Sequence, residues 1–412
     1  MALLLLPILG TTVSAASAVT IENPFWLEER DLGLEAVAAG GSTNQVVLVA
    51  GADGYARLLD GDDPTIQVEL GTPNTNTLRA IDWHPRGNTA LLAGDAGTLL
   101  RYAGEDHSVT TVSGSGVMAG VDLAAVAWNA AGTYAYVGGE DGWIWAYHEG
   151  EGGIGVFDLL NDTGDSQVTG IACHAEVNLC VVSTLSDGIA VLDSRTEHTL
   201  HWIGGTDGVW RGVNCAEPNW NRCIAIGDGR KIGRIGIEQD TPPTSTIMTQ
   251  IINGLSGQFT TVHTRGAGEA LVTLAPFHVM AWDVTNAEGY EWVDHDSVRK
   301  ESSSLAGERL IGTWGTVDNP DIGFIVTSFG GIIGFHPVEE KNVWTDSAVS
   351  WVIGALVIVA VPGVVLGLIF MNSETLQKKY HARRTAKREA AATAATEAEI
   401  LAKKSARKGK KK

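Results

Sequence analysis

The sequence predicts an all-β fold, a seven-bladed β-propeller, which is followed by a single transmembrane α-helix and a basic helical tail. Three observations support this prediction: a motif that recurs seven times at intervals of 42 to 51 residues, an apolar segment of 24 residues without a charged side chain, and opposite net charges on the two sides of that segment. A chain of 412 residues is long enough for this organisation.

The N-terminus has the pattern of a secretory signal. Residues 1–18 contain no ionisable side chain, and Ala2–Leu9 is apolar but too short to cross a membrane. Ala16-Ser17-Ala18 matches the small-x-small pattern of a cleavage site. We therefore expect residues 1–18 to be a signal peptide. An uncleaved anchor is the alternative, because no basic residue precedes the apolar stretch.

Residues 19–347 contain a repeated hexapeptide, which we expect to be the innermost strand of each blade. Each copy opens with a bulky apolar residue, has Ala, Gly or Thr at its third position and is β-branched at its fourth. The copies begin at Leu34, Leu78, Leu123, Val168, Trp210, Phe259 and Leu310. Small third residues suit the crowding of blades near the axis of a propeller.

Each hexapeptide is followed by two further β-rich runs joined by a tight turn, and often by a fourth, more polar run. The turns include Asp53-Gly54, Ala96-Gly97 and Asp141-Gly142. Asp-Gly is typical of a two-residue hairpin turn. Four short strands per repeat indicate a propeller blade, whereas a β-sandwich does not explain seven copies in phase. We expect Val19–Glu22 or Phe25–Glu28 to supply the outer strand of the last blade and so close the ring.

The repeat resembles that of the WD-repeat (Trp-Asp repeat) β-propeller family. Ile81–Tyr102 and Val126–Tyr147 are similar to the second half of that family's repeat, and the likeness extends over about residues 34–340. Trp282-Asp283 is the only Trp-Asp pair at the expected strand end, and no Gly-His dipeptide precedes a first strand. The resemblance therefore implies a divergent, prokaryotic type of propeller. A shared fold by itself implies little about chemistry.

The hairpin turns are expected to lie on one face of the ring. This face then carries acidic residues in five blades, Asp53, Asp95, Asp141, Asp187 and Asp228, and aromatic residues in two, within Ala275–His278 and Ser328–Gly331. Turn chemistry alone is one explanation of the acidic corners. The other is a protein-binding surface with aromatic anchors, since aromatic side chains dominate interface hot spots. The candidate binding residues are Trp143, Phe277, His278, Phe329, Asp53, Asp141, Asp187 and Asp228.

The four cysteines occupy matched places in two neighbouring repeats. Cys173 and Cys180 flank the first hairpin of the fourth repeat, and Cys215 and Cys223 flank that of the fifth. An oxidising exterior permits disulfides, so we expect the pairs Cys173–Cys180 and Cys215–Cys223. Cross-blade pairing and free thiols stay open, because sequence cannot choose among three connectivities. Spacings of seven and eight do not suit a zinc site, and we expect no metal.

The motifs and charges exclude several classes of function. Residues 19–347 contain 16 Lys and Arg against 44 Asp and Glu, a net charge of -28, which argues against a specific nucleic-acid partner. The sequence contains no nucleophile elbow, metalloprotease motif or phosphate loop, and we expect no cofactor. The first hypothesis is a non-catalytic protein-binding scaffold. The alternative is an exported propeller enzyme, a glycosidase or other hydrolase, with its site over the central channel.

Residues 348–371 are predicted to span the membrane once. These 24 residues carry no charge, and about 20 suffice to cross the hydrocarbon core. A buried core helix is the alternative. Lys378-Lys379 and Arg383-Arg384 follow at once, which by the positive-inside rule places the C-terminus in the cytoplasm and the propeller outside the cell membrane. The Gly363 and Gly367 spacing suits helix–helix contact and a homodimer.

The tail, residues 372–412, has the opposite charge to the propeller. It carries 13 Lys and Arg and 4 Asp and Glu, a net charge of +9. Its alternating charges favour a helix with i,i+4 pairing. We expect it to bind anionic lipid and fix the orientation. Docking to cytoplasmic RNA, ribosomes or an acidic protein is the alternative.

Overall fold

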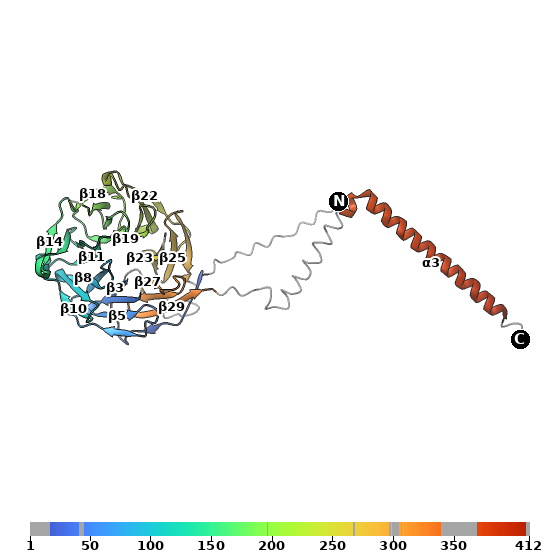
Figure 1. Cartoon of the computed structure of the whole chain (residues 1–412), viewed down its shortest axis with the longest axis horizontal. Coiled ribbons are helices and arrows are strands. Elements are labelled where there is room, and N and C mark those ends of the chain that lie inside the picture. Colours follow the sequence, from blue (N-terminus) through green and yellow to red (C-terminus); the bar gives the residue numbers. More distant parts are fainter. Residues whose placement is uncertain are drawn as a thin grey trace. The chain divides into compact units, whose positions relative to one another are not determined.

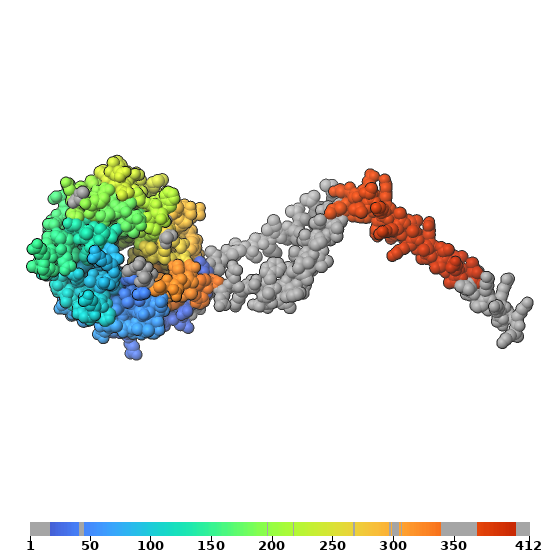
Figure 2. Space-filling view, in the orientation of Figure 1, coloured from blue at the N-terminus to red at the C-terminus, as the bar shows by residue number. Residues whose placement is uncertain are grey.

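The computed structural model describes residues 17–338, except 41–44, 196, 267, 296–297, 299–304 and 306, and residues 369–408. The chain divides into two units, the first ending at Val338. The first unit is a ring of seven antiparallel sheets, six of four strands and one of five, arranged as the blades of a β-propeller (Figure 1). The space-filling view shows that the ring is hollowed at its centre (Figure 2). The predicted seven-bladed, all-β propeller is confirmed.

The strands follow the same order in each blade, from the axis outward. The innermost strands are β3 (Leu34–Ala39), β7 (Leu78–Trp83), β11 (Leu123–Trp128), β15 (Val168–Cys173), β19 (Trp210–Glu217), β23 (Gln258–Gly266) and β27 (Leu310–Gly315). The second strands are β4 (Val46–Gly51), β8 (Thr89–Gly94), β12 (Ala135–Gly139), β16 (Leu179–Thr184), β20 (Arg222–Gly227), β24 (Glu269–Ala275) and β28 (Gly323–Thr327).

The outer half of each blade consists of the third and fourth strands. The third strands are β5 (Ala56–Asp60), β9 (Thr98–Ala103), β13 (Ile144–Glu149), β17 (Ile189–Asp193), β21 (Lys231–Gly236), β25 (His278–Asp283) and β29 (Gly331–Pro337). The fourth strands of the first six blades are β6 (Gln67–Glu69), β10 (Ser108–Thr111), β14 (Gly155–Leu159), β18 (Thr199–Gly204), β22 (Thr246–Ile251) and β26 (Glu288–Val293).

Every innermost strand has an irregular register directly after the first residue of its hexapeptide. The shift falls between the first and third positions of the hexapeptide in all seven blades, as between Leu310 and Gly312. The second residue is therefore bulged out of the ladder. The third residue faces the neighbouring blade: a Cβ on Gly312 would lie 2.2 Å from Cγ1 of Val37 in the first blade. Close approach of blades explains the small residues at this position.

The N-terminal strands close the ring. β1 (Val19–Ile21) pairs with β29 as the outer strand of the seventh blade, and β2 (Phe25–Trp26) pairs with the beginning of the same strand. Both segments that the sequence offered for closure are therefore used. Because β29 is seven residues long, it has room for two short partners. The pairing protects an edge that would otherwise be open to other chains.

The hydrophobic core lies between neighbouring blades. One cluster, for example, combines Leu48 and Leu58 of the first blade with Trp83 and Leu92 of the second. The Trp83 indole also donates from Nε1 to the carbonyl oxygen of Ala38, at 2.9 Å. Buried aromatic side chains thus join successive blades by both packing and hydrogen bonds.

Two disulfides confirm the predicted pairs. Cys173 is bonded to Cys180 and Cys215 to Cys223, and each bond joins the first two strands of one blade. Cross-blade pairing and free thiols are thereby excluded. Closing such short loops stabilises by roughly 2–3 kcal/mol each at most.

The described part of the second unit is helical: a helical stretch at residues 369–372 is followed by the long helix α3 (Glu374–Lys408), which agrees with the predicted helical tail. Residues 1–16 of the expected signal peptide lie outside the described residues. So do residues 348–368 of the expected span, including Gly363 and Gly367. Within residues 17–338 and 369–408, as far as they are described, no helix combines the length and the apolar character that a membrane crossing demands.

Candidate functional site: the corner face

One face of the ring is formed by the hairpins between the second and third strands and by the connections from each blade to the next. We call it the corner face. The five acidic corner residues all lie in these hairpins, so the topology places them on one face as expected: Asp53, Asp95, Asp141, Asp187 and Asp228. The opposite face carries the hairpins between first and second strands and those between third and fourth strands.

Turn geometry accounts for part of the corner sequence. In the first blade Asp53 and Gly54 both have positive φ, 55° and 69°, and in the second blade Ala96 and Gly97 have 55° and 78°. Successive positive φ angles match the type I′ turn that joins two twisted strands. A Cβ on Gly97 would also lie 2.2 Å from the carbonyl oxygen of Met118. Glycine is therefore required at this corner.

Several corner carboxylates have partners within their own blade or the connection before it. Asp187 Oδ2 accepts hydrogen bonds from the amide and the hydroxyl of Ser166, both at 2.7 Å. Asp228 forms a bidentate pair with Arg211, at 2.7 and 3.0 Å, and Asp95 pairs with Arg79. The hydrogen bonds to these acids raise the pKa of both arginines.

The two arginines share one place in the repeat. Arg79 and Arg211 are the bulged second residues of β7 and β19. A bulge changes the direction of a side chain relative to the regular ladder, and here it allows each arginine to reach the corner of its own blade. By contrast, Asp53 and Asp141 are exposed, and neither forms an ion pair with any described residue.

The sixth blade does not provide the expected anchors. Phe277 is 0% exposed and His278 is 3% exposed, so neither is available to a partner at this surface. His278 Nε2 lies 2.9 Å from Glu291 Oε1, and burial lowers the pKa of this histidine. The prediction that Phe277 and His278 are surface anchors is wrong.

The connection that follows β26 explains this burial. Val298 and Leu305 of this connection are fully buried in the same cluster as Phe277 and Trp292. His295 Nδ1 also lies 3.2 Å from the carbonyl oxygen of Phe277. The connection therefore covers the corner of the sixth blade. The sequence of this connection is mostly polar, with few apolar residues. The sequence alone therefore does not show that the connection packs over Phe277.

Other aromatic residues are exposed on the corner face. Trp143 at the corner of the third blade is 43% exposed and lies edge-on to Trp145, with ring centroids 5.8 Å apart. At the seventh blade Phe329 is half-buried against Trp26, with centroids 5.4 Å apart. Trp26 is itself 39% exposed. It was not among the predicted site residues, although its segment was a candidate for ring closure.

The central channel is a cavity of about 760 Å³ lined by the innermost strands of all seven blades. Asp82 Oδ2 accepts a hydrogen bond from the backbone amide of Trp128 in the next blade, at 2.6 Å. Burial raises the pKa of Asp82 to about 7. His263 Nε2 lies 2.9 Å from the carbonyl oxygen of Ile311, also in the next blade, and burial lowers its pKa to about 4.

These channel groups connect blades and are not assembled as a pair. Asp82 is the one carboxylate among the described residues that line the cavity, whereas glycosidases use two facing carboxylates. Nor do the described residues bring together three His, Cys, Asp or Glu side chains that could hold a metal ion.

Geometry therefore assigns the chain to the class of seven-bladed β-propeller proteins. No protein-family model matches the chain, and no curated protein matches it at a significant level.

Proposed function

We propose that the protein is a membrane-anchored, extracytoplasmic β-propeller, a divergent relative of the WD-repeat propellers, that acts as a non-catalytic protein-binding scaffold. The observation that carries the proposal is the aromatic side chains on the corner face: exposed Trp143 in the third blade, and exposed Trp26 with half-buried Phe329 in the seventh. Large aromatic residues at a surface are typical anchors of protein interfaces.

Charge defines the kind of partner. Asp53 and Asp141 are exposed beside these aromatic residues on the corner face and form no ion pair with described residues. The surrounding propeller is strongly acidic. A partner with basic residues around an apolar centre complements such a surface, and the charges accelerate its association. The two aromatic groups lie on separate blades, which favours a partner with a broad contact surface.

The membrane anchor in this proposal is the apolar segment 348–371, with Gly363 and Gly367 available for dimer contact. The basic tail provides a second interaction. Almost all described side chains of α3 are exposed, and the exposed ones include Lys378, Lys379 and Arg383. The helix lacks a continuous apolar stripe, so its attraction to anionic lipid headgroups is electrostatic.

Site-specific crosslinking tests the docking surface. A photo-reactive amino acid is placed in the full-length protein, in intact cells, at position 143, 329 or 220. Trp220 is the matched control, because it is 57% exposed but lies in the hairpin between β19 and β20 on the opposite face. We expect discrete protein adducts from positions 143 and 329 and none of the same mass from position 220.

Substitution provides the second arm of this test. Trp143→Ala should reduce the adducts formed from position 329, because truncating a hot-spot anchor weakens binding by about tenfold or more. Trp220→Ala should leave them unchanged. Equal adducts from all three positions, or no response to Trp143→Ala, would show that the corner face is not the docking surface.

A further inference from the structure

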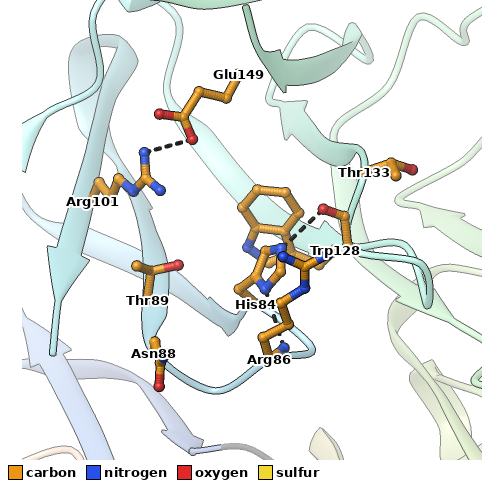
Figure 3. Close-up of a pocket in the computed structure, with 9 residues that line it drawn as sticks. His84, Arg86, Asn88, Thr89, Arg101, Trp128, Thr133 and Glu149 are labelled. Carbon is orange, nitrogen blue, oxygen red and sulfur yellow. Dashed lines mark hydrogen bonds and ion pairs between the residues drawn. The ribbon is translucent and has the colours of Figure 1, made fainter. Parts of the chain in front are cut away.

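A separate hollow of about 360 Å³ lies between the second and third blades (Figure 3). Its walls include the hairpin between β7 and β8, with His84 and Arg86, and the hairpin between β11 and β12, with Thr133. These hairpins belong to the face opposite the corner face. The volume is within the usual range of small-molecule sites, about 300–1,000 Å³.

The guanidinium group of Arg86, at this hollow, has no hydrogen-bond or ion-pair partner among the described residues. Nine of the described Lys and Arg side chains in the propeller form ion pairs with Asp or Glu. Arg222 and Arg230 donate instead to backbone carbonyls. Of the described arginines in the propeller, only Arg86 and Arg234 have a guanidinium group without a hydrogen bond or ion pair to another described residue. In a protein with so many carboxylates, this leaves Arg86 available to an external anion.

The loop that carries Arg86 is held in place by His84. The amide of Arg86 donates to His84 Nδ1 at 3.1 Å, and the amide of Gly87 donates to the His84 carbonyl at 2.7 Å. His84 Nε2 lies 2.9 Å from the carbonyl oxygen of Gly132 in the third blade. The two hairpins are thus tied together across the blade boundary. A ligand there does not have to order the loop, which lowers the entropic cost of binding.

A second guanidinium group lies at the other side of the hollow. Arg101 forms an ion pair with Glu149 at 3.0 Å, and both side chains are partly exposed (Figure 3). Arg86, Arg101 and Glu149 together carry a net charge of +1, which one negative charge neutralises. A guanidinium group matches the planar shape of a carboxylate. A second negative charge on the ligand would exceed this net charge and would lie near the Glu149 carboxylate without a further cation to pair with.

The remaining walls suit a ligand with hydroxyl groups. Asn88, Thr89 and Thr133 present amide and hydroxyl groups around the hollow (Figure 3). Trp128 also lines it and packs edge-on against His84, with ring centroids 4.7 Å apart. The Trp128 Nε1 atom is buried and has no hydrogen-bond partner among the described residues. An aromatic wall with neutral donors and acceptors provides both apolar contact and hydrogen bonds.

We infer that this hollow binds a small hydroxylated monocarboxylate, of the chemical class of a hexuronic acid, with its carboxylate held by Arg86. Asn88, Thr89 and Thr133 hydrogen-bond the hydroxyl groups of the ligand, and the sugar ring of the ligand packs against Trp128. The inference is independent of protein docking, because the corner face is on the other side of the propeller.

Calorimetric titration of the purified full-length protein tests the inference with three probes. We expect saturable binding of glucuronate. Glucose has no carboxylate and glucose 6-phosphate carries about two negative charges, and both should bind about tenfold more weakly or worse. Equal binding of glucuronate and glucose, or no saturable binding of glucuronate, would overturn the proposal. Tighter binding of the phosphate ester would overturn its assignment to a monocarboxylate.

Variants assign the binding to these residues. Arg86→Ala should weaken glucuronate binding by about tenfold or more, since it removes a charge-assisted hydrogen bond. Arg234→Ala removes the other unpaired arginine, in the fifth blade, and should have no effect. Glu149→Gln should reduce the difference in affinity between glucuronate and glucose 6-phosphate. Unchanged binding in Arg86→Ala, with unaltered thermal unfolding of this variant, would contradict the proposal.

Discussion

At the scale of single residues, polar side chains in the channel hold the blades together. Asp82 and His263 both contact the backbone of the following blade. Asn214 extends the pattern, because its Oδ1 accepts a hydrogen bond from Thr264 of the next blade at 3.2 Å. All three residues occupy the fifth position of the hexapeptide. The repeat thus places contacts between blades at a defined position of the innermost strand.

The two titratable members of this set should have opposite effects on the pH dependence of stability. Asp82 has a pKa of about 7 in the folded protein, above the ordinary 3.8, so the folded state binds more protons and its stability falls as pH rises between these values. His263 has a pKa of about 4, below the ordinary 6.5. The unfolded state then binds more protons, and stability rises with pH over that range.

Unfolding of conservative variants between pH 4 and pH 7 separates the two effects. Relative to the unsubstituted protein, Asp82→Asn should become more stable as pH rises, and His263→Gln should become more stable as pH falls. The double variant should show the sum of the two changes, because the residues lie in different blades and share no partner. Parallel pH profiles for all variants would show that neither group titrates differently in the folded state.

At the scale of elements, the bulge in each innermost strand explains the most regular feature of the repeat. The bulge directs the second residue toward the corner and presents the third to the adjacent blade. Arg79 and Arg211 illustrate the first effect, and Gly312 the second. A hexapeptide pattern can be recognised in the sequence without this explanation. The register shift is a property of the pairing between the first and second strands, so the sequence alone does not show it.

Two glycines at the same repeat position provide a matched test of blade crowding. A Cβ on Gly312 would lie 2.2 Å from Val37 Cγ1, whereas a Cβ on Gly212 would find its nearest neighbour at 3.7 Å. Gly312→Ala should therefore destabilise the propeller by about 1–3 kcal/mol through overpacking. Gly212→Ala should change stability far less. Urea unfolding measures both, and equal effects would contradict crowding as the cause.

At the scale of the whole molecule, stability depends on ring closure by the N-terminal strands. Removing residues 19–28 takes away β1 and β2, which leaves β29 with an unpaired edge. Such edges recruit strands from other chains. We therefore expect the truncated protein to unfold at a lower temperature and to self-associate, as measured by calorimetry and light scattering.

A peptide of residues 19–28 provides the control for this truncation. Added in excess, it should pair with β29 and raise the unfolding temperature of the truncated chain, as any ligand of the folded state does. A truncated chain that remains monomeric and unfolds at the original temperature would show that closure contributes little.

The blade number, the closing strands and the disulfide pairs were all predictable from the sequence. Hydrophobic alternation and turn residues act over a few neighbouring positions, and seven copies reinforce one another. The site was predicted less completely. Trp143 and Phe329 retain exposed surface, but Phe277 and His278 do not. Local patterns identify a corner and its residues without showing what covers it.

The sequence by itself determined the periodic features of this protein, because each depends on strand alternation, turn conformation or the spacing of cysteines along the chain. Only the tertiary structure decided which side chains remain accessible and which become partners. Arg86 and Arg101 are far from Thr133 in the sequence but line the same hollow. Phe277 is buried by the connection between β26 and the next blade. Burial and convergence arise from contacts between segments distant in sequence, and these contacts exist only once the ring has formed.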